Sequence, residues 1–598
     1  MPRFLNPRGT YVWIPGVYSI INLISSLPAS LPDFMIPVII GQAEEAAVPY
    51  TFASTKEAGE ESAFIFQYMS NAAAAKDAFG DDSDIAVAMK YAKRHGLPGA
   101  YCIAGNALTR ASVIATSTGP VVQGTFYAKR YGPAGGHIKI AAVSGTTFTV
   151  TGIKRYSLLT ANAASGASRL YLKDTSWIVE GDTLYIGDND STDAAYVVAT
   201  KGSELTTTGQ INYYITLTTT LAAAIATAQY GMVFTYDTDN AEAPAAFASV
   251  QEAVDYFNGT TSKLLGFTVA TATFTNPASF IAIATATPLK EIAGWSTATA
   301  GTAPAIASGD HTAIVALFQS TAWDAFCIAT GVIPQQFLIL DSSTTAHTTW
   351  RDWAIDKRAD ETPGARPVGI MAGVAWGDTS TTATNSTSPN WRAGQLNHQD
   401  VAVVANGMDK IAAYLSHAPA IFGLMIGGGV KHNLTNDQYQ GAPQWEIAWD
   451  ERTLEQLTTL TKKGVITNKF SSGGNFNKWV VSAGVATLQN NNAAYTGDSP
   501  ATTCLLQQRH FCDFINAAYT AVLEGTQVGG DGITRDSISA VLVSLGANLL
   551  KQGYVSETPT ISSITLDDTG AGWNVVVACK PPVTADFIGL TLNILVGE

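Results

Sequence analysis

Apolar residues at helical spacing dominate the last third of the chain. One stripe follows the i, i+3, i+4, i+7 pattern of a buried helix face and stops at Gly553. It contains Ile538, Val541, Leu542, Leu545, Leu549 and Leu550. A second long helix is predicted over Leu505 to Leu523, and a shorter one over Leu454 to Leu460 that ends in a basic turn and a glycine stop. Strands are predicted at Trp479 to Val481, Val485 to Leu488, Trp573 to Ala578 and Phe587 to Val596.

Strand and helix patterns alternate nearer the start of the chain. Met35 to Ile40 is a short apolar run typical of a buried strand, and Ala100 to Ala104 predicts another. Between them, Glu57 to Ser70 and Asp84 to His95 have helical spacing, with Gly96 as a stop after the second. This alternation predicts an α/β layer.

The pattern of apolar and polar residues changes between residues 120 and 240, where short alternating segments are separated by Gly, Asp, Asn and Ser. Such spacing is typical of a small antiparallel β domain. The segments are His137 to Ala141, Thr147 to Thr151, Arg169 to Leu172, Thr183 to Ile186, Tyr196 to Ala199, Tyr213 to Leu217 and Met232 to Tyr236. Helical spacing returns at Ser249 to Phe257, and strand patterns at Leu265 to Ala270 and Phe337 to Leu340, so the β domain is interpreted as an insertion.

The stretch from 360 to 450 is interpreted as loop-rich. Its Ser, Thr and Asn cluster from Asp378 to Asn390 predicts a surface loop. The apolar run Ile421 to Ile426 precedes Gly427, Gly428 and Gly429. Because no helix start and no lysine follow, these glycines favour a flexible loop over a phosphate-binding turn.

Both ends of the chain have the pattern of extended arms. Residues 1 to 35 hold five prolines, too many for a helix, around short strand-like pieces. In Phe587 to Val596 one face is entirely apolar, and it consists of Ile588, Leu590, Leu592, Ile594 and Val596. An isolated strand leaves its N–H and C=O groups unpaired. The arms therefore either fold back into a sheet of their own chain or pair with neighbouring copies.

The sequence contains none of the usual catalytic signatures. It has no G-x-x-x-x-G-K-[ST] loop, no H-E-x-x-H pair and no G-x-S-x-G elbow. Its eight histidines are isolated from one another. The loop from Asp188 begins like a calcium loop, but its sixth position is Asp193 rather than glycine, which favours a hairpin turn. We predict no catalytic residue, no cofactor and no metal.

Composition and charge limit the kinds of molecule that the protein is expected to bind and the compartment in which it is expected to work. Only 14% of residues are charged and the net charge is -14, which argues against a surface that binds phosphate backbones. Five scattered cysteines without a C-x-x-C pair favour a reducing compartment over a disulfide framework. The apolar stretch Tyr11 to Leu27 resembles a secretory signal but is interrupted by Pro15 and Gly16, and no other run approaches a membrane span. A soluble protein is expected.

Several segments, taken in order, resemble the contractile tail sheath proteins of phages with contractile tails. The C-terminal segments are Gly464 to Asn468, Trp479 to Leu488, Leu505 to Ile515, the helix that ends at Gly553, and the terminal strand. The N-terminal segments are Pro15 to Tyr18, Phe52 to Gly59 and Lys90 to Gly96. One departure is Ala486, where the family often has an arginine.

The resemblance implies a structural protein, not an enzyme. Sheath subunits form stacked hexameric rings around a tail tube, are linked by their terminal arms, and contract to drive the tube through the host envelope. It further implies a place in the virion tail, assembly in the host cytoplasm, and the tail tube, baseplate and tail terminator proteins as partners. No direct contact with nucleic acid and no membrane insertion are expected.

We therefore expect an α+β multidomain protein with α/β sheath core domains, an inserted antiparallel β domain and extended N- and C-terminal β arms. The predicted division is 1–35 N-terminal arm, 36–119 first part of the core, 120–240 inserted outward-facing β domain, 241–450 second part of the core, 451–560 tube-facing α/β domain and 561–598 C-terminal arm.

Two sets of residues are expected to act in assembly. The resemblance makes the apolar C-terminal face and the N-terminal residues Val17, Tyr18, Ile20 and Ile21 candidates for linking subunits. Lys462, Lys463 and Arg509 are candidates for contacts with an oppositely charged tube, although solvated or intramolecular roles fit each of them equally well.

Two other classes of protein remain open. A surface adhesin or S-layer-like protein would share the Thr-, Ala- and Gly-rich composition and the β domain. A glycan-active enzyme would need two carboxylates about 5 to 10 Å apart. Glu446 and Asp450, flanked by tryptophans, are candidates for such a pair, but at i, i+4 they fit one face of a structural helix better.

Overall fold

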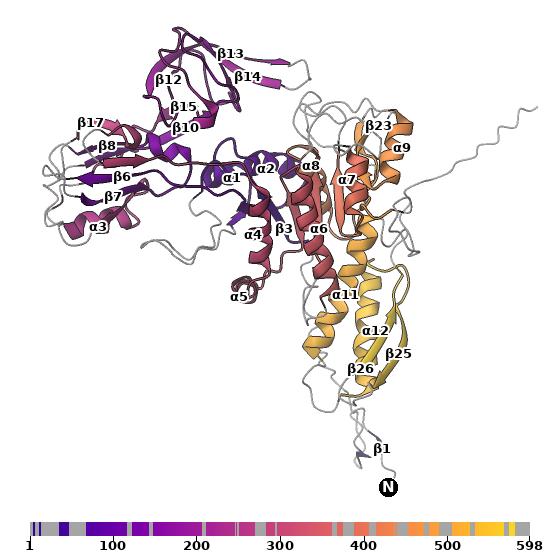
Figure 1. Ribbon diagram of the computed structural model, residues 1–598. Coiled ribbons are helices and arrows are strands. Elements are labelled where there is room, and N and C mark those ends of the chain that lie inside the picture. The colour runs from indigo at the N-terminus through magenta and orange to yellow at the C-terminus, as the bar shows by residue number, and fades with distance from the viewer. Residues whose placement is uncertain are drawn as a thin grey trace, which may run out of the picture. The chain divides into compact units, whose positions relative to one another are not determined.

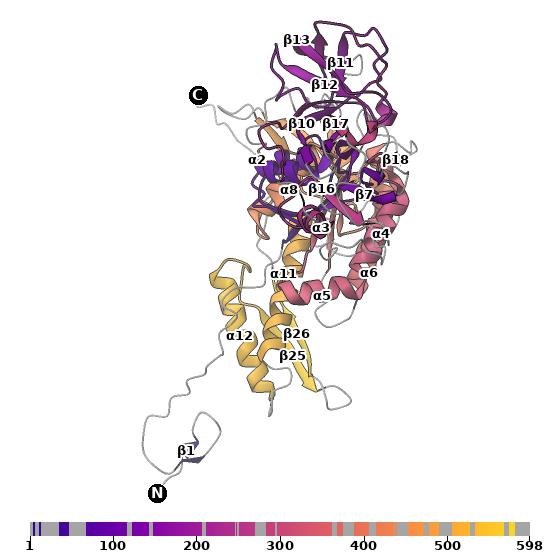
Figure 2. The same ribbon diagram turned by 90° about the vertical axis from the view of Figure 1, so that its left-hand side faces the viewer.

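The computed structural model resolves into two compact units (Figures 1 and 2). The first contains Met1–Phe34, Asp360–Arg366 and Gln507–Glu598, and the second contains Met35–Ala359 and Pro367–Leu506. The described residues are 4–5, 11–12, 35–46, 67–116, 122–142, 148–205, 211–244, 247, 250–269, 283–292, 296–360, 367–374, 388–405, 414–435, 437–438, 453–471, 478–489, 505–526, 533–566 and 573–580. Among the helices they form, none by itself is long and apolar enough to cross a membrane.

A seven-stranded sheet is the centre of the second unit, with strand order β22-β21-β20-β19-β3-β5-β4. Its strands are β3 (Pro37–Gly41), β4 (Gln67–Met69), β5 (Ala100–Ala104), β19 (Gln336–Ile339), β20 (Gly369–Gly373), β21 (Val401–Val404) and β22 (Val465–Ile466). All neighbours are parallel except β4 and β5. Strands such as β3 are buried along their whole length because helices cover both faces, so they are apolar throughout rather than alternating.

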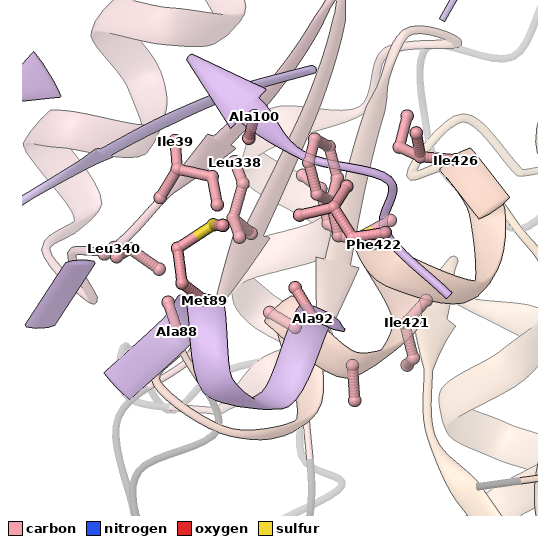
Figure 3. Packing of buried hydrophobic residues seen from close by; sticks show 14 of the residues in the cluster. Ile39, Ala88, Met89, Ala92, Ala100, Leu338, Leu340, Ile421, Phe422 and Ile426 are labelled. Atoms are coloured by element: carbon pink, nitrogen blue, oxygen red, sulfur yellow. The ribbon is translucent and has the colours of Figure 1, made fainter. Parts of the chain in front are cut away.

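One face of this sheet packs against α1 (Ala72–Phe79), α2 (Asp84–Arg94) and α8 (His417–Gly428). Figure 3 shows Met89 of α2 and Phe422 of α8 meeting Leu338 of β19 in this core. The other face packs against α4 (Ser308–Phe318), α5 (Thr321–Thr330), α6 (Thr344–Ala359), α7 (Pro389–Leu396) and α9 (Leu454–Lys462). The predicted α/β layer is confirmed as a three-layer α/β/α arrangement.

The prediction of a loop-rich stretch from 360 to 450 is wrong, because it contains β20, α7, β21 and α8. Gly427 and Gly428 lie in α8, which packs closely on α2, and Gly429 is the C-cap of this helix with φ +72°. A Cβ on Gly423 would lie 2.3 Å from the carbonyl oxygen of Ala92, and one on Gly427 would lie 2.5 Å from that of Gly96. Gly423 and Gly427 therefore allow close approach of two backbones, whereas Gly429 ends the helix.

A second difference concerns the helix predicted over Glu57 to Ser70. Its end forms β4, which pairs with β5 at the edge of the sheet, and its first part lies outside the described residues. Likewise, Val485 forms an isolated bridge with Leu505 rather than a strand. The predicted strand at Trp479 is confirmed as β24 (Lys478–Val481), which pairs with β23 (Asn468–Ser471).

Between β5 and α4 the chain forms two further β-sheets, which we name the β-sheet body. One sheet has the order β16-β7-β6-β18 and another the order β17-β8-β9. Their elements are β6 (Ser112–Thr116), β7 (Val122–Ala128), β8 (Lys139–Ala142), β9 (Phe148–Thr151), α3 (Val250–Asn258), β16 (Leu265–Val269), β17 (Ile283–Pro288) and β18 (Ser296–Thr299), with the 3-10 helices η1 (Pro133–His137) and η4 (Leu289–Glu291). Phe126, Phe148, Phe257 and Phe267 form its aromatic core, with the rings of Phe126 and Phe267 4.6 Å apart.

A closed β-barrel is inserted into the β-sheet body between β9 and α3. Its strand order is β10-β15-β12-β13-β14-β11, all antiparallel, and a bridge between Leu159 and Leu172 joins the first and last strands. Its elements are β10 (Ile153–Leu158), β11 (Arg169–Leu172), β12 (Thr183–Gly187), β13 (Ala194–Leu205), β14 (Ile211–Leu217), the 3-10 helix η2 (Thr227–Gln229) and β15 (Met232–Tyr236). The two chain passages into the barrel are adjacent, because the N–H of Asp237 donates to the carbonyl oxygen of Gly152 at 2.9 Å.

The strands predicted between 120 and 240 are therefore present, but they belong to more than one structure. Those at 137–141 and 147–151 contribute to β8 and β9 of the β-sheet body, whereas those from 169 onward form the barrel. The sheet containing β7 is completed by β16 and β18, which lie beyond residue 240. Antiparallel pairing between distant strands leaves no mark in local alternation, so these partners were not separable by pattern.

The first unit contains two long helices and a hairpin (Figure 2). These are α11 (Leu506–Thr526), α12 (Arg535–Lys551), β25 (Thr560–Leu566) and β26 (Trp573–Ala578), with β1 (Phe4–Leu5) and β2 (Tyr11–Val12) as a further two-stranded pair. α11 and α12 lie where the apolar stripes predict two long helices. The side chain of Thr534 caps α12 by accepting from the N–H of Ser537.

Candidate functional site

The carboxyl ends of β3 and β19 form a topological switch point. The chain after β3 leads to helices on one face of the sheet, whereas the chain after β19 leads to α6 on the other. Ligands of doubly wound sheets commonly bind in the crevice at such a point. In this protein the place is occupied by a polar network around Asp341, His311, His347 and Arg392.

Hydrogen bonds assign the protons in this network. The indole N–H of Trp350 donates to Nδ1 of His311 at 3.1 Å, so Nε2 of His311 carries the proton and donates to Oδ2 of Asp341 at 2.8 Å. Burial alone would raise the pKa of Asp341, but the hydrogen bonds from His311 and from the N–H of Ser343 outweigh it and the pKa lies below its usual value. The Asp341 carboxylate is therefore ionised and accepts hydrogen bonds from His311 and from the Ser343 N–H.

His347 is held neutral in the same way. Nη1 of Arg392 donates to Nδ1 of His347 at 2.7 Å, and Nε2 of His347 donates to the carbonyl oxygen of Asp341 at 2.6 Å. Complete burial, together with the charge of Arg392, lowers the pKa of His347 to about 3. These side chains bind one another and support Trp350 in the core below. Among the described residues, no group of three or more His, Cys, Asp or Glu side chains is placed to hold a metal ion.

The loop from Asp188 forms a turn between β12 and β13, as predicted. Its carboxylate accepts from the N–H groups of Asp190, Ser191 and Ala226 at 2.7 to 3.0 Å. These backbone donors lower the pKa of Asp188 against the effect of burial. The carboxylate shapes the turn.

A groove lined by apolar and polar side chains lies in the first unit between α11 and β26. Its volume is about 450 Å³. Phe511, Ile515, Tyr519 and Leu523 line it from α11, and Val575 and Val577 line it from β26. The side chain of Val576, between those two valines, points the other way and is 53% exposed.

Among the described residues, the hairpin over this groove forms a sheet of two strands. Within the described residues β25 and β26 pair only with each other, so each leaves one edge of N–H and C=O groups without a neighbouring strand. A two-stranded hairpin is marginal in water, and additional strands stabilise it. The groove and the two edges together form a surface suited to receiving extended segments.

The three tube-facing candidates do not form one group. Lys462 is the exposed last residue of α9 and Lys463 is its C-cap, and both lie in the second unit. Arg509 lies in the first unit on α11, where it forms an ion pair with Asp513 one turn later. The predicted domain from 451 to 560 contains the boundary between the units at Leu506 and Gln507.

The arm candidates lie outside the described residues. These arm candidates are Val17, Tyr18, Ile20, Ile21, Ile588, Leu590, Leu592, Ile594 and Val596. Glu446 and Asp450, the candidate carboxylate pair, also lie outside the described residues. The groove was not foreseen from sequence, because the stripe along α11 predicts only that one helix face is buried. The β-branched residues of β25, which are Thr560, Ile561, Ile564 and Thr565, are a signal for the strand that the sequence analysis missed.

Comparison with known proteins gave matches among solved structures. No family model matches the sequence, and no curated protein matches it either. The sheath tail protein of Listeria innocua superposes with a TM-score of 0.50 at 10% identity, over 93% of this chain and 94% of that one. The sheath tail protein of Desulfitobacterium hafniense superposes with a TM-score of 0.48 at 12% identity, over 96% and 100% respectively. The match to the Listeria protein shows a shared fold.

Proposed function

We propose that this chain is the structural subunit of a contractile phage tail sheath. The observation that carries the proposal is the fold shared with a sheath tail protein over nearly the whole chain. In the proposed assembly, subunits stack as hexameric rings around the tail tube and meet the baseplate and tail terminator proteins at the two ends. Assembly takes place in the host cytoplasm, and contraction drives the tube through the host envelope.

No chemical step is needed for such a machine. The extended lattice is kinetically trapped, and contraction releases the free energy of larger or better subunit interfaces. A heterologous contact that does not close on itself generates the helix. Negative-stain microscopy of the purified protein tests the proposal, with tubular polymers expected and a uniformly monomeric protein contradicting it.

The hairpin supports a specific link between subunits. Extended segments from neighbouring copies would add to its two edges by main-chain hydrogen bonds and place alternate apolar side chains on the groove side. The C-terminal arm supplies such a segment in Phe587 to Val596, and the N-terminal arm supplies a second around Val17 to Ile21. Main-chain links of this kind hold subunits together while the globular parts move.

The barrel is proposed to be an outward-facing module that polymerisation does not need. Because Gly152 and Asp237 are hydrogen-bonded neighbours, deletion of 153–236 with the two ends joined leaves both sheets of the β-sheet body intact. The deletion protein is expected to polymerise like the full chain in microscopy. Deleting 120–240 instead serves as a control that should fail to fold, since it removes β7, β8 and β9. Loss of all polymer from a folded 153–236 deletion would contradict this role.

Lys462 and Lys463 are proposed to contact an oppositely charged tube. Changing both to Glu should reduce co-sedimentation with tube protein at low salt, and the difference from wild type should shrink as salt screens the charges. Lys154→Glu with Lys263→Glu gives the same change in net charge at two exposed lysines elsewhere. Equal co-assembly of the two double variants at low salt would remove Lys462 and Lys463 as tube contacts.

A further inference from the structure

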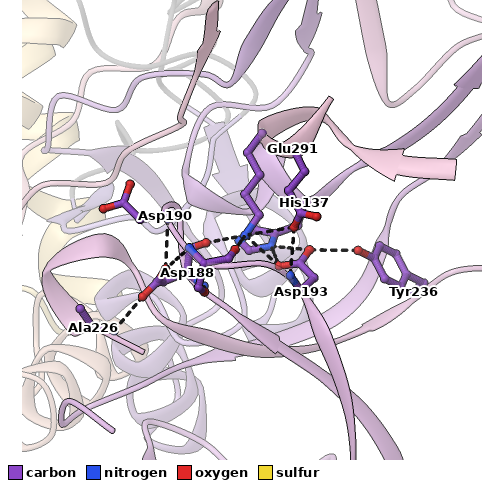
Figure 4. A network of polar contacts seen from close by, with 9 residues as sticks. His137, Asp188, Asp190, Asp193, Ala226, Tyr236 and Glu291 are labelled. Atoms are coloured by element: carbon purple, nitrogen blue, oxygen red, sulfur yellow. Dashed lines mark hydrogen bonds and ion pairs between the residues drawn. The ribbon is translucent and has the colours of Figure 1, made fainter. Parts of the chain in front are cut away.

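Two polar clusters, each with a buried centre, attach the barrel to the rest of the second unit. The first, which we name the acidic junction, consists of Glu44, Glu45, Asp82, Asp84 and Lys173. The second, which we name the His137 cluster, joins η1 and η4 to the turn between β12 and β13 and is drawn in Figure 4.

The acidic junction joins the barrel to the α/β layer directly. Lys173, immediately after β11, places Nζ 2.7 Å from Oε1 of Glu44, which follows β3 and is 1% exposed. Ser157 of β10 donates from Oγ to Oδ2 of Asp82 at 2.6 Å, and Asp82 lies in the turn between α1 and α2. Both barrel strands at this edge therefore end on carboxylates of the α/β layer.

The junction is closely packed as well as charged. Gly80 has φ +104°, and a Cβ there would lie 2.6 Å from the hydroxyl of Tyr156 and 2.8 Å from Cβ of Glu44. The Tyr156 hydroxyl is buried and has no hydrogen-bond partner among the described residues. Glu44 and Asp82 are buried, so little water screens the charges of these two carboxylates from each other, whereas Lys173 and Arg130 remain partly exposed.

Negative groups outnumber positive ones at the junction. Arg130 pairs with Glu45 at 2.9 Å and Lys173 pairs with Glu44, which leaves Asp82 and Asp84 without a cation of their own at salt-bridge distance among the described residues. The other charged groups that face the junction lie at its periphery and are Lys76, Asp81, Arg155, Asp174 and Asp341.

Burial sets the titration of the junction. It raises the pKa of Glu45 to about 7 and that of Asp84 to about 6, and burial with the neighbouring Glu44 raises the pKa of Asp82 well above its usual range. A carboxyl group whose pKa is raised by folding binds its proton more tightly in the folded state. Its contribution to stability is therefore present at acidic pH and is lost as pH rises through the raised pKa.

At the centre of the His137 cluster, the pair His137 and Asp193 titrates differently, although burial raises the pKa of the neighbouring Glu291. Asp193 accepts from Nδ1 of His137 at 2.8 Å, from Nζ of Lys290 at 2.8 Å and from the hydroxyl of Tyr236 at 3.1 Å. Burial lowers the pKa of His137, and the contacts from His137 and Lys290 lower the pKa of Asp193 despite its burial. Neither group changes its protonation state as pH rises above 7.

We propose that the acidic junction is a charge-sensitive latch that opens as Glu45, Asp82 and Asp84 lose protons, while the His137 cluster keeps the barrel attached as a pivot. The barrel then has one fixed and one releasable attachment, in addition to the two adjacent chain passages at Gly152 and Asp237.

Hydrogen exchange of the unassembled full-length chain tests the latch. Protection, expressed relative to the intrinsic exchange rate, is compared at pH 5.5 and 8.5 in peptides covering 80–84, 172–176 and 188–193. We expect about tenfold lower protection at pH 8.5 in the first two peptides, which corresponds to about one pKa unit of linkage. Peptide 188–193, in the His137 cluster, should change by less than about twofold on the same scale. Equal protection at both pH values in all three peptides would overturn the proposal.

Matched variants assign the effect to the junction. Asp82→Asn keeps an acceptor for the Ser157 hydroxyl and removes the titrating charge, so most of the pH response should disappear. Asp84→Asn makes the same change independently on α2. Asp190→Asn, an exposed acid on the barrel, should retain the full response. If Asp82→Asn and Asp84→Asn both retain it as well, the latch does not titrate at these groups.

Discussion

Truncation after Pro582 is expected to give a folded monomer that no longer polymerises. The shortened chain keeps α11, α12, β25 and β26 but lacks Phe587 to Val596. If that segment is donated to a neighbour, its loss removes five apolar side chains worth about 1.5 to 3 kcal/mol each, on the order of 10 kcal/mol before ordering costs. Circular dichroism should be unchanged, and microscopy should find no tubes.

A shorter truncation separates this loss from a general effect of an altered terminus. Removing only Gly597 and Glu598 keeps all five apolar positions and should leave polymerisation intact. A one-residue register slip would turn the apolar face outward. Inserting one alanine after Leu590 moves Leu592, Ile594 and Val596 to the opposite face, so it should abolish polymerisation if the link is specific in register. Tubes of normal length from the Pro582 truncation would show that this segment is not the linker.

Replacing Trp350 with alanine is expected to destabilise the α/β/α layers severely. Trp350 is fully buried on α6 and packs on Phe318, Phe337 and Trp353 at ring distances of 5.5 to 6.1 Å. Removing a buried tryptophan costs about 3 to 5 kcal/mol. The change also deprives Nδ1 of His311 of its donor, which adds about 1 to 3 kcal/mol.

Urea unfolding followed by far-ultraviolet circular dichroism measures this loss. Trp350→Phe keeps most of the ring and loses the N–H, so it should fall between wild type and the alanine variant. Ile328→Ala on α5 removes an apolar side chain that is 84% exposed and should change the free energy of unfolding by less than about 0.5 kcal/mol. A loss below about 1 kcal/mol for Trp350→Ala would mean that the network does not depend on this residue.

Local pattern was sufficient wherever an element buries a single face. The apolar stripe that stops at Gly553 corresponds to α12, and the alternating segments after 169 correspond to barrel strands, because in each the period of the side chains matches the buried surface. Apolar runs also predicted β3, β5 and β19, which are buried on both faces. Pattern failed for the shorter runs of β20 and β21 and where glycine permits contact. β20 and β21 are short and apolar throughout, and the glycines of α8 resemble a loop until α2 is seen beside them.

The candidate site was predictable to a similar extent. The apolar face of the C-terminal arm follows from alternation alone, whereas the groove that could receive it is formed by residues of α11 and β26 about 60 positions apart. The pairing of Arg509 with Asp513 is an i, i+4 contact that sequence could have supplied. The network at Asp341 could not be foreseen, since it joins α4, α6 and α7 through tertiary contacts alone.

The place of the barrel within the chain affects the order in which the protein can fold during synthesis. β3 pairs with β19, and their paired residues Ile40 and Ile339 are about 300 positions apart. At about 5 to 20 residues per second, a ribosome needs roughly 15 to 60 s to make the intervening chain. During that time β3 lacks its central neighbour, while the barrel, whose strands all lie between Ile153 and Tyr236, can close. The nascent barrel is thus expected to fold first, and the parallel sheet is completed only when translation has passed it.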